Sequence, residues 1–149
     1  LGPLARPGRA ETARAVAAME TLGIAGLAGE EIPRLSGGQR QMILIARALA
    51  QGARTIVMDE PTASLDFANR IRVGQAIRAL ADRGTAVILS THDPDQAAAL
   101  GDHALLVGRG RVLGDGPVRE VMTADRLSAL YDIPVLRETL SGGGLHFRG

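Results

Sequence analysis

Short apolar runs alternate with longer amphipathic segments along the chain, and this alternation constrains the fold more than any other feature. Two runs of apolar and β-branched residues, 55–58 and 85–90, flank a segment, 69–82, whose apolar residues recur at helical spacing. Runs of this length typically form buried parallel strands, because the helices that cross between parallel strands cover the faces of the sheet. The sequence therefore predicts an α/β fold with a mostly parallel sheet.

The same periodicities predict the elements on either side of this unit. Two helices, 9–22 and about 40–51, are predicted before it. After it we expect a short helix at 97–100, two strands joined by a turn at 104–113, and two more helices at 118–122 and 124–131. Residues 1–8 are predicted to be irregular, and 141–144 form a low-complexity segment that follows no predicted strand.

Composition excludes several classes of protein. The 149 residues include no Cys, so a disulfide framework and a thiolate metal site are excluded. The longest apolar stretches, 42–46 and 86–89, are far shorter than the roughly 20 residues that a membrane-spanning helix needs. A net charge of +1 gives no support to a broad nucleic-acid-binding surface. We therefore expect a globular protein that reaches a membrane only by docking to another protein.

A glycine-containing loop, Leu35-Ser36-Gly37-Gly38-Gln39, opens one of the predicted helices. Two glycines let the backbone approach an anion closely, and the start of a helix presents N–H groups that carry a partial positive charge. Ser36 adds a hydroxyl group, so the loop can bind a phosphate. The alternative is that the glycines only turn the chain into the helix.

Two adjacent carboxylates, Asp59 and Glu60, end the first predicted strand. Neighbouring side chains of an extended chain point to opposite faces, so the two groups can perform different tasks. Asp59 can hold Mg²⁺ through water, and Glu60 can orient or deprotonate an attacking water molecule. Open α/β sheets bind their ligands at the carboxyl ends of the strands. The alternative is a pair of solvated acids.

Two further patterns are weaker when each is taken alone. The tripeptide Ser64-Leu65-Asp66 is typical of a loop or of a helix cap. His92 follows the second predicted strand, where a histidine can contact a bound anion, although a single histidine is usually structural. His103 and His146 have no such position, and we interpret them as ordinary surface or core residues.

The order of these patterns resembles that of the ABC ATPases. In that family the loop at 35–39 is called the signature motif, the strand and turn at 55–61 the Walker B motif, 64–66 the D-loop and 90–93 the H-loop. The similarity covers about residues 9–135, which is most of the chain. It implies part of the P-loop ATPase fold, together with the helical subdomain that carries the signature motif.

The resemblance also implies ATP and Mg²⁺ as cofactors and a head-to-tail dimer with a second nucleotide-binding subunit. In such a dimer each signature motif binds the γ-phosphate of the ATP that the opposite subunit holds. The implied roles are ATP binding for Ser36, Gly37, Gly38 and Gln39, coupling of the two nucleotide sites for Asp66, Mg²⁺ binding for Asp59, and catalysis for Glu60 as the base and His92 as a γ-phosphate contact.

One departure from the family pattern is large. The P-loop of these ATPases ends in Gly-Lys-Ser/Thr and holds the β- and γ-phosphates, but this chain contains no Lys. We expect residues 1–53 to be a remnant of the helical subdomain and 54–149 to be the C-terminal part of the RecA-like catalytic subdomain. We expect the chain alone neither to bind ATP tightly nor to hydrolyse it. We also expect an exposed apolar sheet edge, because the neighbouring P-loop strand is missing.

Within the family, the segments 65–69, 92–97 and 121–131 resemble those of importers of ferric siderophores, haem and cobalamin. This resemblance implies an ATP-hydrolysing subunit on the cytoplasmic face of the inner membrane. Its partners would be transmembrane permease subunits and an extracytoplasmic substrate-binding protein that acts through them, with no nucleic acid. The alternatives are a non-transport ABC ATPase, in DNA repair, chromosome structure or ribosome function, and a catalytically inactive remnant.

Overall fold

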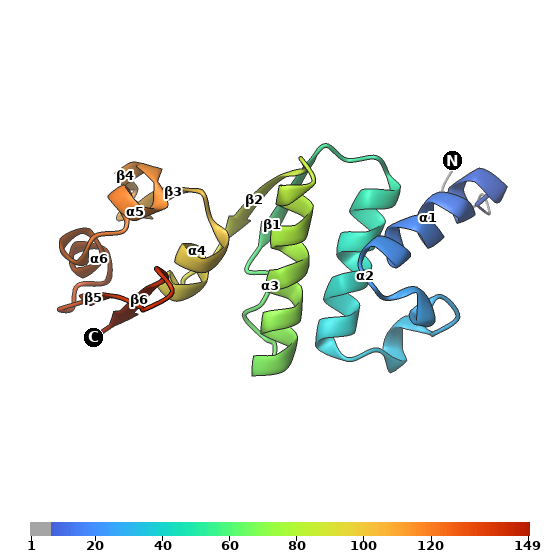
Figure 1. The fold of residues 1–149 in the computed structure, drawn as a ribbon, viewed down its shortest axis with the longest axis horizontal. Helices are drawn as coiled ribbons and strands as arrows, with labels where there is room; N and C mark the ends of the chain where they lie inside the picture. The colour runs from blue at the N-terminus through green and yellow to red at the C-terminus, as the bar shows by residue number, and fades with distance from the viewer. Residues whose placement is uncertain (1–6) are drawn as a thin grey trace. The chain divides into compact units, whose positions relative to one another are not determined.

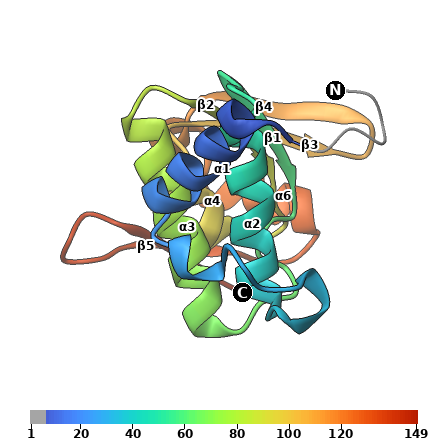
Figure 2. The same cartoon turned by 90° about the vertical axis from the view of Figure 1, so that its right-hand side faces the viewer.

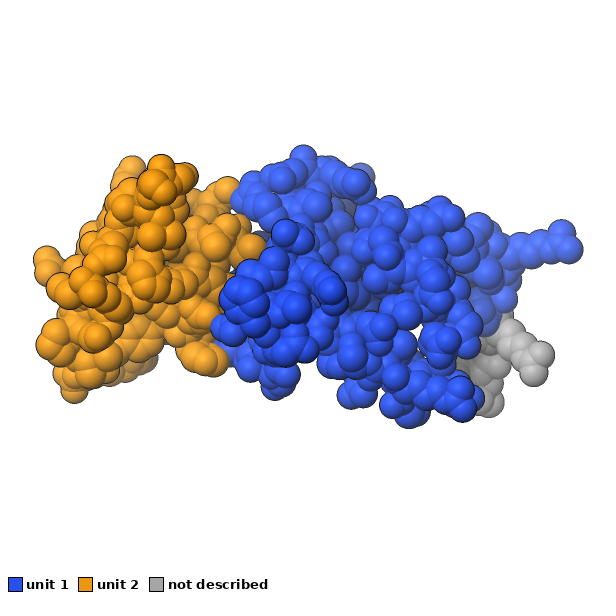
Figure 3. All heavy atoms as spheres, turned by 60° about the horizontal axis from the view of Figure 1, so that its bottom comes forward, with its two compact units in different colours: residues 1–90 blue, residues 91–149 orange. Residues whose placement is uncertain are grey.

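In the computed structural model, which describes residues 7–149, the strand–helix–strand unit forms as the sequence predicts. The chain divides into two units, Leu1–Ser90 (unit 1) and Thr91–Gly149 (unit 2) (Figure 3). Of the segment predicted to be irregular at the start of the chain, only residues 7 and 8 are described, and they precede the first helix without regular structure. The earlier part of that segment lies outside the described residues.

The described part of unit 1, residues 7–90, contains three helices, two short 3₁₀ turns and one pair of strands. Their bounds are α1 Arg9–Thr21, η1 Ala25–Leu27, η2 Ile32–Arg34, α2 Gly37–Ala50, β1 Thr55–Asp59, α3 Phe67–Asp82 and β2 Ala86–Ser90. The strands β1 and β2 are parallel, and α3 crosses between them and contacts β2. The three helices lie side by side, with α1 against α2 and α2 against α3 (Figures 1 and 2).

The inward face of α3 supplies the centre of the unit 1 core. Val73, Ile77 and Leu80, which the sequence places on one helix face, are all buried, with at most 2% of their surface exposed. Complete burial of such a side chain contributes about 1.5–3 kcal/mol to stability. The helix ends where predicted, because Gly84 adopts a φ of 89°, a left-handed conformation that stops the helix at small cost.

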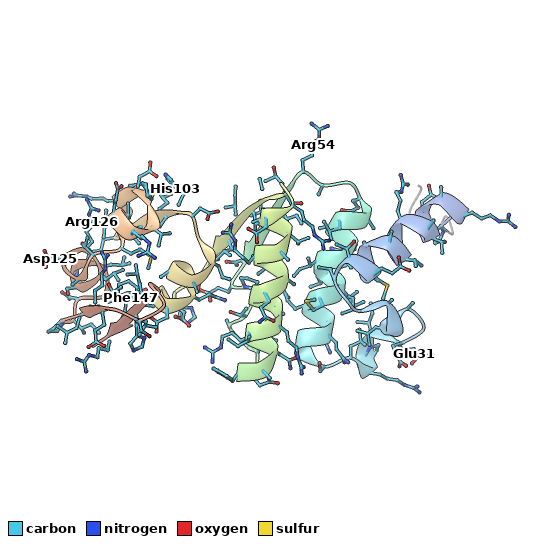
Figure 4. The ribbon with its side chains drawn as sticks, in the orientation of Figure 1. Glu31, Arg54, His103, Asp125, Arg126 and Phe147 are labelled. Carbon is cyan, nitrogen blue, oxygen red and sulfur yellow. The ribbon has the colours of Figure 1, made fainter. Side chains whose placement is uncertain are left out.

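Unit 2 contains three helices and two antiparallel hairpins. Their bounds are α4 Pro94–Leu100, β3 His103–Gly108, β4 Arg111–Pro117, α5 Val118–Val121, α6 Ala124–Tyr131, β5 Leu136–Thr139 and β6 Leu145–Arg148. Its core is formed by Leu106, Val118, Val121, Met122, Leu127, Val135 and Phe147. These side chains come from four elements and two connecting loops, so the core joins both hairpins to the helices; Phe147 of β6 is labelled in Figure 4.

The α/β class is confirmed, but parallel pairing is limited to β1–β2 among the strands of residues 7–149. Strands β3 and β4 pair antiparallel because only two residues, Arg109 and Gly110, connect them. Both have positive φ values, 51° and 71°, as a two-residue hairpin turn requires. A parallel connection needs a dozen or more residues. The turn signal at 108–111 therefore identified a hairpin.

The C-terminal hairpin is an element that the sequence did not predict. Residues 141–144 were expected to follow no strand, but they form the turn between β5 and β6. Strand β5 has the sequence Leu-Arg-Glu-Thr, which contains a single apolar residue and so carries no periodic signal. Its pairing with β6 and the packing of Phe147 into the unit 2 core stabilise it instead.

The two parallel strands are not buried on both faces as predicted. Val57 and Ile88 lie directly opposite each other in the β1–β2 register, and 73% and 60% of their surfaces are exposed. Alternate residues, such as Ile56 and Met58, are buried on the other face. The pair Val57 and Ile88 therefore forms an apolar patch on one face of a two-stranded sheet.

We expect this patch to make the 149-residue chain self-associate. Replacing Val57 and Ile88 together by Thr keeps two β-branched residues but removes the apolar contact, so the monomer fraction is expected to rise. Sedimentation velocity at several concentrations measures this fraction. Ile32→Thr is the matched control, since Ile32 is also 60% exposed but lies in η2. An equal effect of the control, or no effect of the double substitution, would contradict the prediction.

Candidate functional site

The carboxyl ends of β1 and β2 bring the two predicted acids together with a serine. Asp59 is the last residue of β1, and Ser90, the last residue of β2, lies opposite it. The Ser90 hydroxyl donates a hydrogen bond to Asp59 Oδ1. The backbone N–H of Glu60 donates to Ser90 Oγ at 3.1 Å and to the Ser90 carbonyl oxygen at 3.2 Å. Ser90 thus fixes both the Asp59 side chain and the Glu60 backbone.

Glu60 has an unusual backbone conformation. Its φ is 46°, in the left-handed region that few residues other than glycine adopt, and Pro61 follows it. The prediction that the Asp59 and Glu60 side chains point to opposite faces requires an extended backbone at both residues. The left-handed φ of Glu60 does not meet this requirement. The two carboxylates nevertheless have different surroundings, since Asp59 is exposed and Glu60 is half-buried. Rare backbone conformations of this kind concentrate at functional sites.

The loop at 36–39 forms the first turn of α2, with Ser36 as its N-cap. The Gln39 N–H donates to Ser36 Oγ at 3.2 Å, and the Ser36 N–H donates to Gln39 Oε1 at 2.9 Å. This reciprocal capping box shows that the two polar side chains start the helix. The N–H groups of Gly37 and Gly38 precede the first intrahelical donor, Arg40 N, so the helix itself gives them no acceptor.

Asp66 is the N-cap of α3, as the helix-cap interpretation of 64–66 predicted. Its Oδ1 accepts the Asn69 N–H at 2.8 Å, and its Oδ2 accepts Asn69 Nδ2 at 2.7 Å. The pKa of the Asp66 carboxyl is lowered, chiefly by the hydrogen bond from the Asn69 backbone. The Asn69 side chain and the charge of Arg72 are among the smaller contributions that also lower it. The Asp66 carboxylate is therefore ionised at neutral pH and already has hydrogen-bond donors within its own subunit.

His92 lies in unit 2, where its side chain is exposed. The Tyr131 hydroxyl donates to the His92 carbonyl oxygen at 2.9 Å, which ties the end of α6 to this loop. Asp93 caps the following helix, α4, by accepting from the N–H groups of Asp95 and Gln96 at 3.0 and 3.1 Å. Two helices thus position the His92 backbone.

The other histidines are partly exposed and pair with carboxylates. His103 Nδ1 lies 3.6 Å from Asp115 Oδ1, and His146 Nδ1 lies 2.8 Å from Asp95 Oδ2. His103 is labelled in Figure 4. Neither adjoins the predicted site residues of unit 1 by sequence or by a hydrogen bond, which fits their interpretation as ordinary residues.

Unit 1 therefore holds two groups of predicted site residues. One is the strand-end group, Asp59 and Glu60; the other comprises the first turn of α2 and the Asp66 cap of α3, which meet where Gly38 contacts Asn69. Three positioning residues escaped the sequence analysis: Ser90, Asn69 and Tyr131. Ser90 begins the H-loop pattern at 90–93, and that place at a strand end is the signal that could have identified it.

The metal-binding capacity of the strand-end group is limited. Within the described part of the chain, residues 7–149, no three His, Asp or Glu residues are grouped so that they could hold a metal ion. Mg²⁺ at a nucleotide site usually takes only one or two carboxylates and completes its shell with phosphates and water. The single carboxylate of Asp59, oriented by Ser90, fits this requirement.

We expect Ser90→Ala to loosen the strand-end group, because Asp59 loses a hydrogen-bond donor and Glu60 loses an acceptor. A hydrogen bond to a charged group contributes about 1.5–3 kcal/mol when well formed, and less when exposed. The free energy of unfolding should therefore fall by about 1–2 kcal/mol in urea titrations. Ser90→Thr retains the hydroxyl and should restore most of the loss. Equal stability of Ser90→Ala and the native chain would show that the contact is unimportant.

Comparison with known proteins places this site in a family. Residues 5–63, which include the loop at 36–39 and the strand-end acids, match the family model described as ABC transporter. The chain is 44% identical over 126 residues to a cobalamin import ATP-binding protein, BtuD, of Halobacterium salinarum, and 43% identical over 122 residues to a hemin import ATP-binding protein, HmuV, of Nocardia farcinica. These alignments cover 84% and 80% of the chain, but only 32% and 41% of the relatives.

The fold gives the same result. An inward-facing structure of an ABC transporter assigned to the metal-chelate type matches 99% of the chain with a TM-score of 0.90 and 34% identity, over 60% of its own chain. The protein described here thus has part of the fold of an ATP-binding cassette. The matched segment belongs to the ABC transporter family, and the chain spans about half or less of the length of the first curated relatives.

The helices of residues 7–149 differ from membrane-spanning helices. None of them combines the length and the apolar character that crossing a bilayer requires.

Proposed function

We propose that this chain is part of the ATP-hydrolysing subunit that powers an ABC importer of a metal chelate, such as an iron siderophore, haem or cobalamin. The observation that supports this most directly is the order of the signature, Walker B, D-loop and H-loop patterns on a fold that matches a metal-chelate type transporter with a TM-score of 0.90. The cobalamin and hemin import functions of the two relatives support the substrate class.

The strand-end group performs the hydrolytic step in this proposal. Glu60 accepts a proton from, or orients, the water molecule that attacks the γ-phosphate. Asp59, oriented by Ser90, would hold Mg²⁺ through water, and the ion would neutralise charge on the phosphates. His92 contacts the γ-phosphate, and Tyr131 supports its loop through the His92 carbonyl.

The signature loop acts on a nucleotide that the opposite subunit holds. The N–H groups of Gly37 and Gly38, at the positive end of α2, donate to the γ-phosphate, and Ser36 and Gln39 contribute polar side chains. Asp66 couples the two sites from the neighbouring helix start. Because this chain contains no Lys, the P-loop lysine comes from another polypeptide segment, and the 149-residue chain alone is expected to be inactive.

We further propose that residues 1–53 belong to the helical subdomain and 54–149 to the catalytic subdomain. The partners are a second nucleotide-binding subunit, two permease subunits and, through the permease, an extracytoplasmic binding protein. The subunit docks peripherally on the cytoplasmic face of the inner membrane. Nucleic acid is not a partner, in line with the net charge of +1.

Affinity purification of the full-length subunit from detergent-solubilised membranes tests this proposal. We expect a multi-span permease to co-purify with it and ATP hydrolysis to depend on the assembly. Recovery of ribosomes or DNA in place of a permease would contradict the importer. Steady ATP hydrolysis by a purified, monodisperse sample of the 149-residue chain would contradict the proposal that its site is completed in trans.

A further inference from the structure

We propose that Asn69 is a positioning residue that locks the first turn of α2 to the first turn of α3, and that residue 38 is glycine because this contact leaves no space for a Cβ atom. The packing half of this inference stands on the geometry of unit 1 alone. Its consequence for ATP rests on the proposed function, since these two turns carry the signature loop and the D-loop aspartate.

Gly38 is buried at the point where the two helices start. A Cβ atom built on Gly38 would lie 2.5 Å from both Cγ and Oδ1 of Asn69 and 2.7 Å from its Cβ. Real Cβ atoms essentially never approach another heavy atom within 3.0 Å. Because one of the three contacts involves the Asn69 Cβ, which is fixed to the α3 backbone, rotation of the Asn69 side chain cannot relieve the overlap. The helices themselves would have to separate.

Asn69 is also held firmly in this position. Its Nδ2 donates to Asp66 Oδ2 at 2.7 Å, and its backbone N–H donates to Asp66 Oδ1 at 2.8 Å. On the other side, Asn69 Oδ1 accepts from Arg72 Nη1 at 3.5 Å. A movement of Asn69 away from Gly38 would therefore break the cap of α3. The contact with Gly38 and the orientation of Asp66 depend on the same side chain.

The neighbouring glycine has a different environment. A Cβ atom on Gly37 would meet only Leu65 Cδ2, at 3.2 Å, which is the far end of a flexible side chain and can move by a few tenths of an ångström. If both glycines served only to let the backbone approach a phosphate, a methyl group should be equally harmful at either position. Packing against Asn69 predicts that only the methyl group at 38 disturbs the fold.

The structural consequence is that the two helix starts behave as one rigid body. A displacement of the loop at 36–39 moves Asn69, and Asn69 carries the Asp66 carboxylate with it. In the proposed dimer, a phosphate contact at the signature loop would thus change the position of Asp66 within the same subunit. Asn69 provides that link without touching the nucleotide, so it is a positioning residue.

Hydrogen exchange in the full-length protein tests the packing without any nucleotide. Gly38→Ala is expected to increase amide exchange roughly tenfold or more in the first turns of both α2 and α3, because overpacking forces the helices apart. Gly37→Ala, the matched control, should leave exchange in α3 near its native level. Adding Asn69→Gly to Gly38→Ala should restore slow exchange in the first turn of α2, whereas adding Asn69→Ala should restore it only partly, since the Cβ contact at 2.7 Å remains.

An increase confined to α2, or a failure of Asn69→Gly to rescue Gly38→Ala, would overturn the proposal. If Gly38→Ala does not fold, Asn69→Ala alone serves instead, and the two turns should then exchange independently of each other; continued joint exchange would also overturn it. ATP hydrolysis measured on the same variants tests the proposed consequence for ATP separately from the helix packing. Gly37→Ala, which leaves the helix packing unchanged, tests the loop: native hydrolysis by this variant would contradict the proposed role of the loop in ATP binding and leave the packing inference intact.

Discussion

Glu60→Gln is expected to reduce ATP hydrolysis by the full-length subunit about 10²–10⁴-fold and to leave ATP binding nearly unchanged. A general base contributes roughly this factor to a proton transfer, and an amide of the same shape cannot accept the proton. The substitution keeps the volume of the side chain and the hydrogen bonds from the Glu60 N–H to Ser90. Single-turnover hydrolysis and equilibrium binding of ATP, measured separately, give the two quantities.

The control is Glu138→Gln, which makes the same chemical change on β5, where the carboxylate pairs with Arg148. Hydrolysis by this variant should match that of the native protein. Asp59→Asn provides a contrast, since it would weaken the proposed Mg²⁺ contact and should raise the Mg²⁺ concentration needed for half-maximal activity. Native hydrolysis by Glu60→Gln would remove Glu60 from the mechanism, and loss of ATP binding by the same variant would point to a structural role.

The helices α2 and α3 could be predicted from sequence, because each buries an apolar stripe that repeats at helical spacing. α3 is the clearest case, since Val73, Ile77 and Leu80 are its buried apolar side chains. Strand pairing was harder to predict. The apolar runs of β1 and β3 look alike, but β1 pairs parallel through a crossover helix, whereas β3 pairs antiparallel through a two-residue turn. The pairing depends on the length of the connection, and not on the run itself.

The candidate site residues were named from the sequence because each of them lies in a short motif. The residues that position them were not, because their partners are far away in sequence or depend on helix packing. Ser90 contacts Asp59 across 31 positions, and Tyr131 contacts His92 across 39. Gly38 is the most instructive residue. The sequence left open whether this glycine lets the backbone approach a phosphate or only turns the chain into the helix. The structure adds that Asn69 leaves no space for a Cβ atom at this position.

The burial of the strands shows a further limit of sequence reasoning. An apolar run predicts that its side chains are buried, but it does not identify the element that covers them. Ile56 and Met58 are covered within unit 1, whereas Val57 and Ile88 are exposed. Periodicity therefore predicts which apolar side chains should be buried. Only the packed structure shows which of them are covered.

Leu127→Ala is expected to lower the free energy of unfolding by about 2–5 kcal/mol, which is the range measured for buried leucines. Leu127 is 1% exposed and lies in the unit 2 core beside residues from both hairpins. Unit 2 comprises only residues 91–149, and units of this size have little stability to spare. Unfolding in guanidinium chloride, followed by circular dichroism, measures the loss.

Leu105→Ala is the matched control, because Leu105 lies in the same unit but is 57% exposed. A surface substitution of this kind should change stability by no more than about 0.5 kcal/mol. The comparison also bears on function, since Leu127 anchors α6, and α6 ends at Tyr131, whose hydroxyl holds the His92 carbonyl. In the full-length subunit, Leu127→Ala should therefore lower the rate of ATP hydrolysis more than Leu105→Ala does. Equal effects of the two substitutions on both stability and hydrolysis would show that the unit 2 core does not support His92.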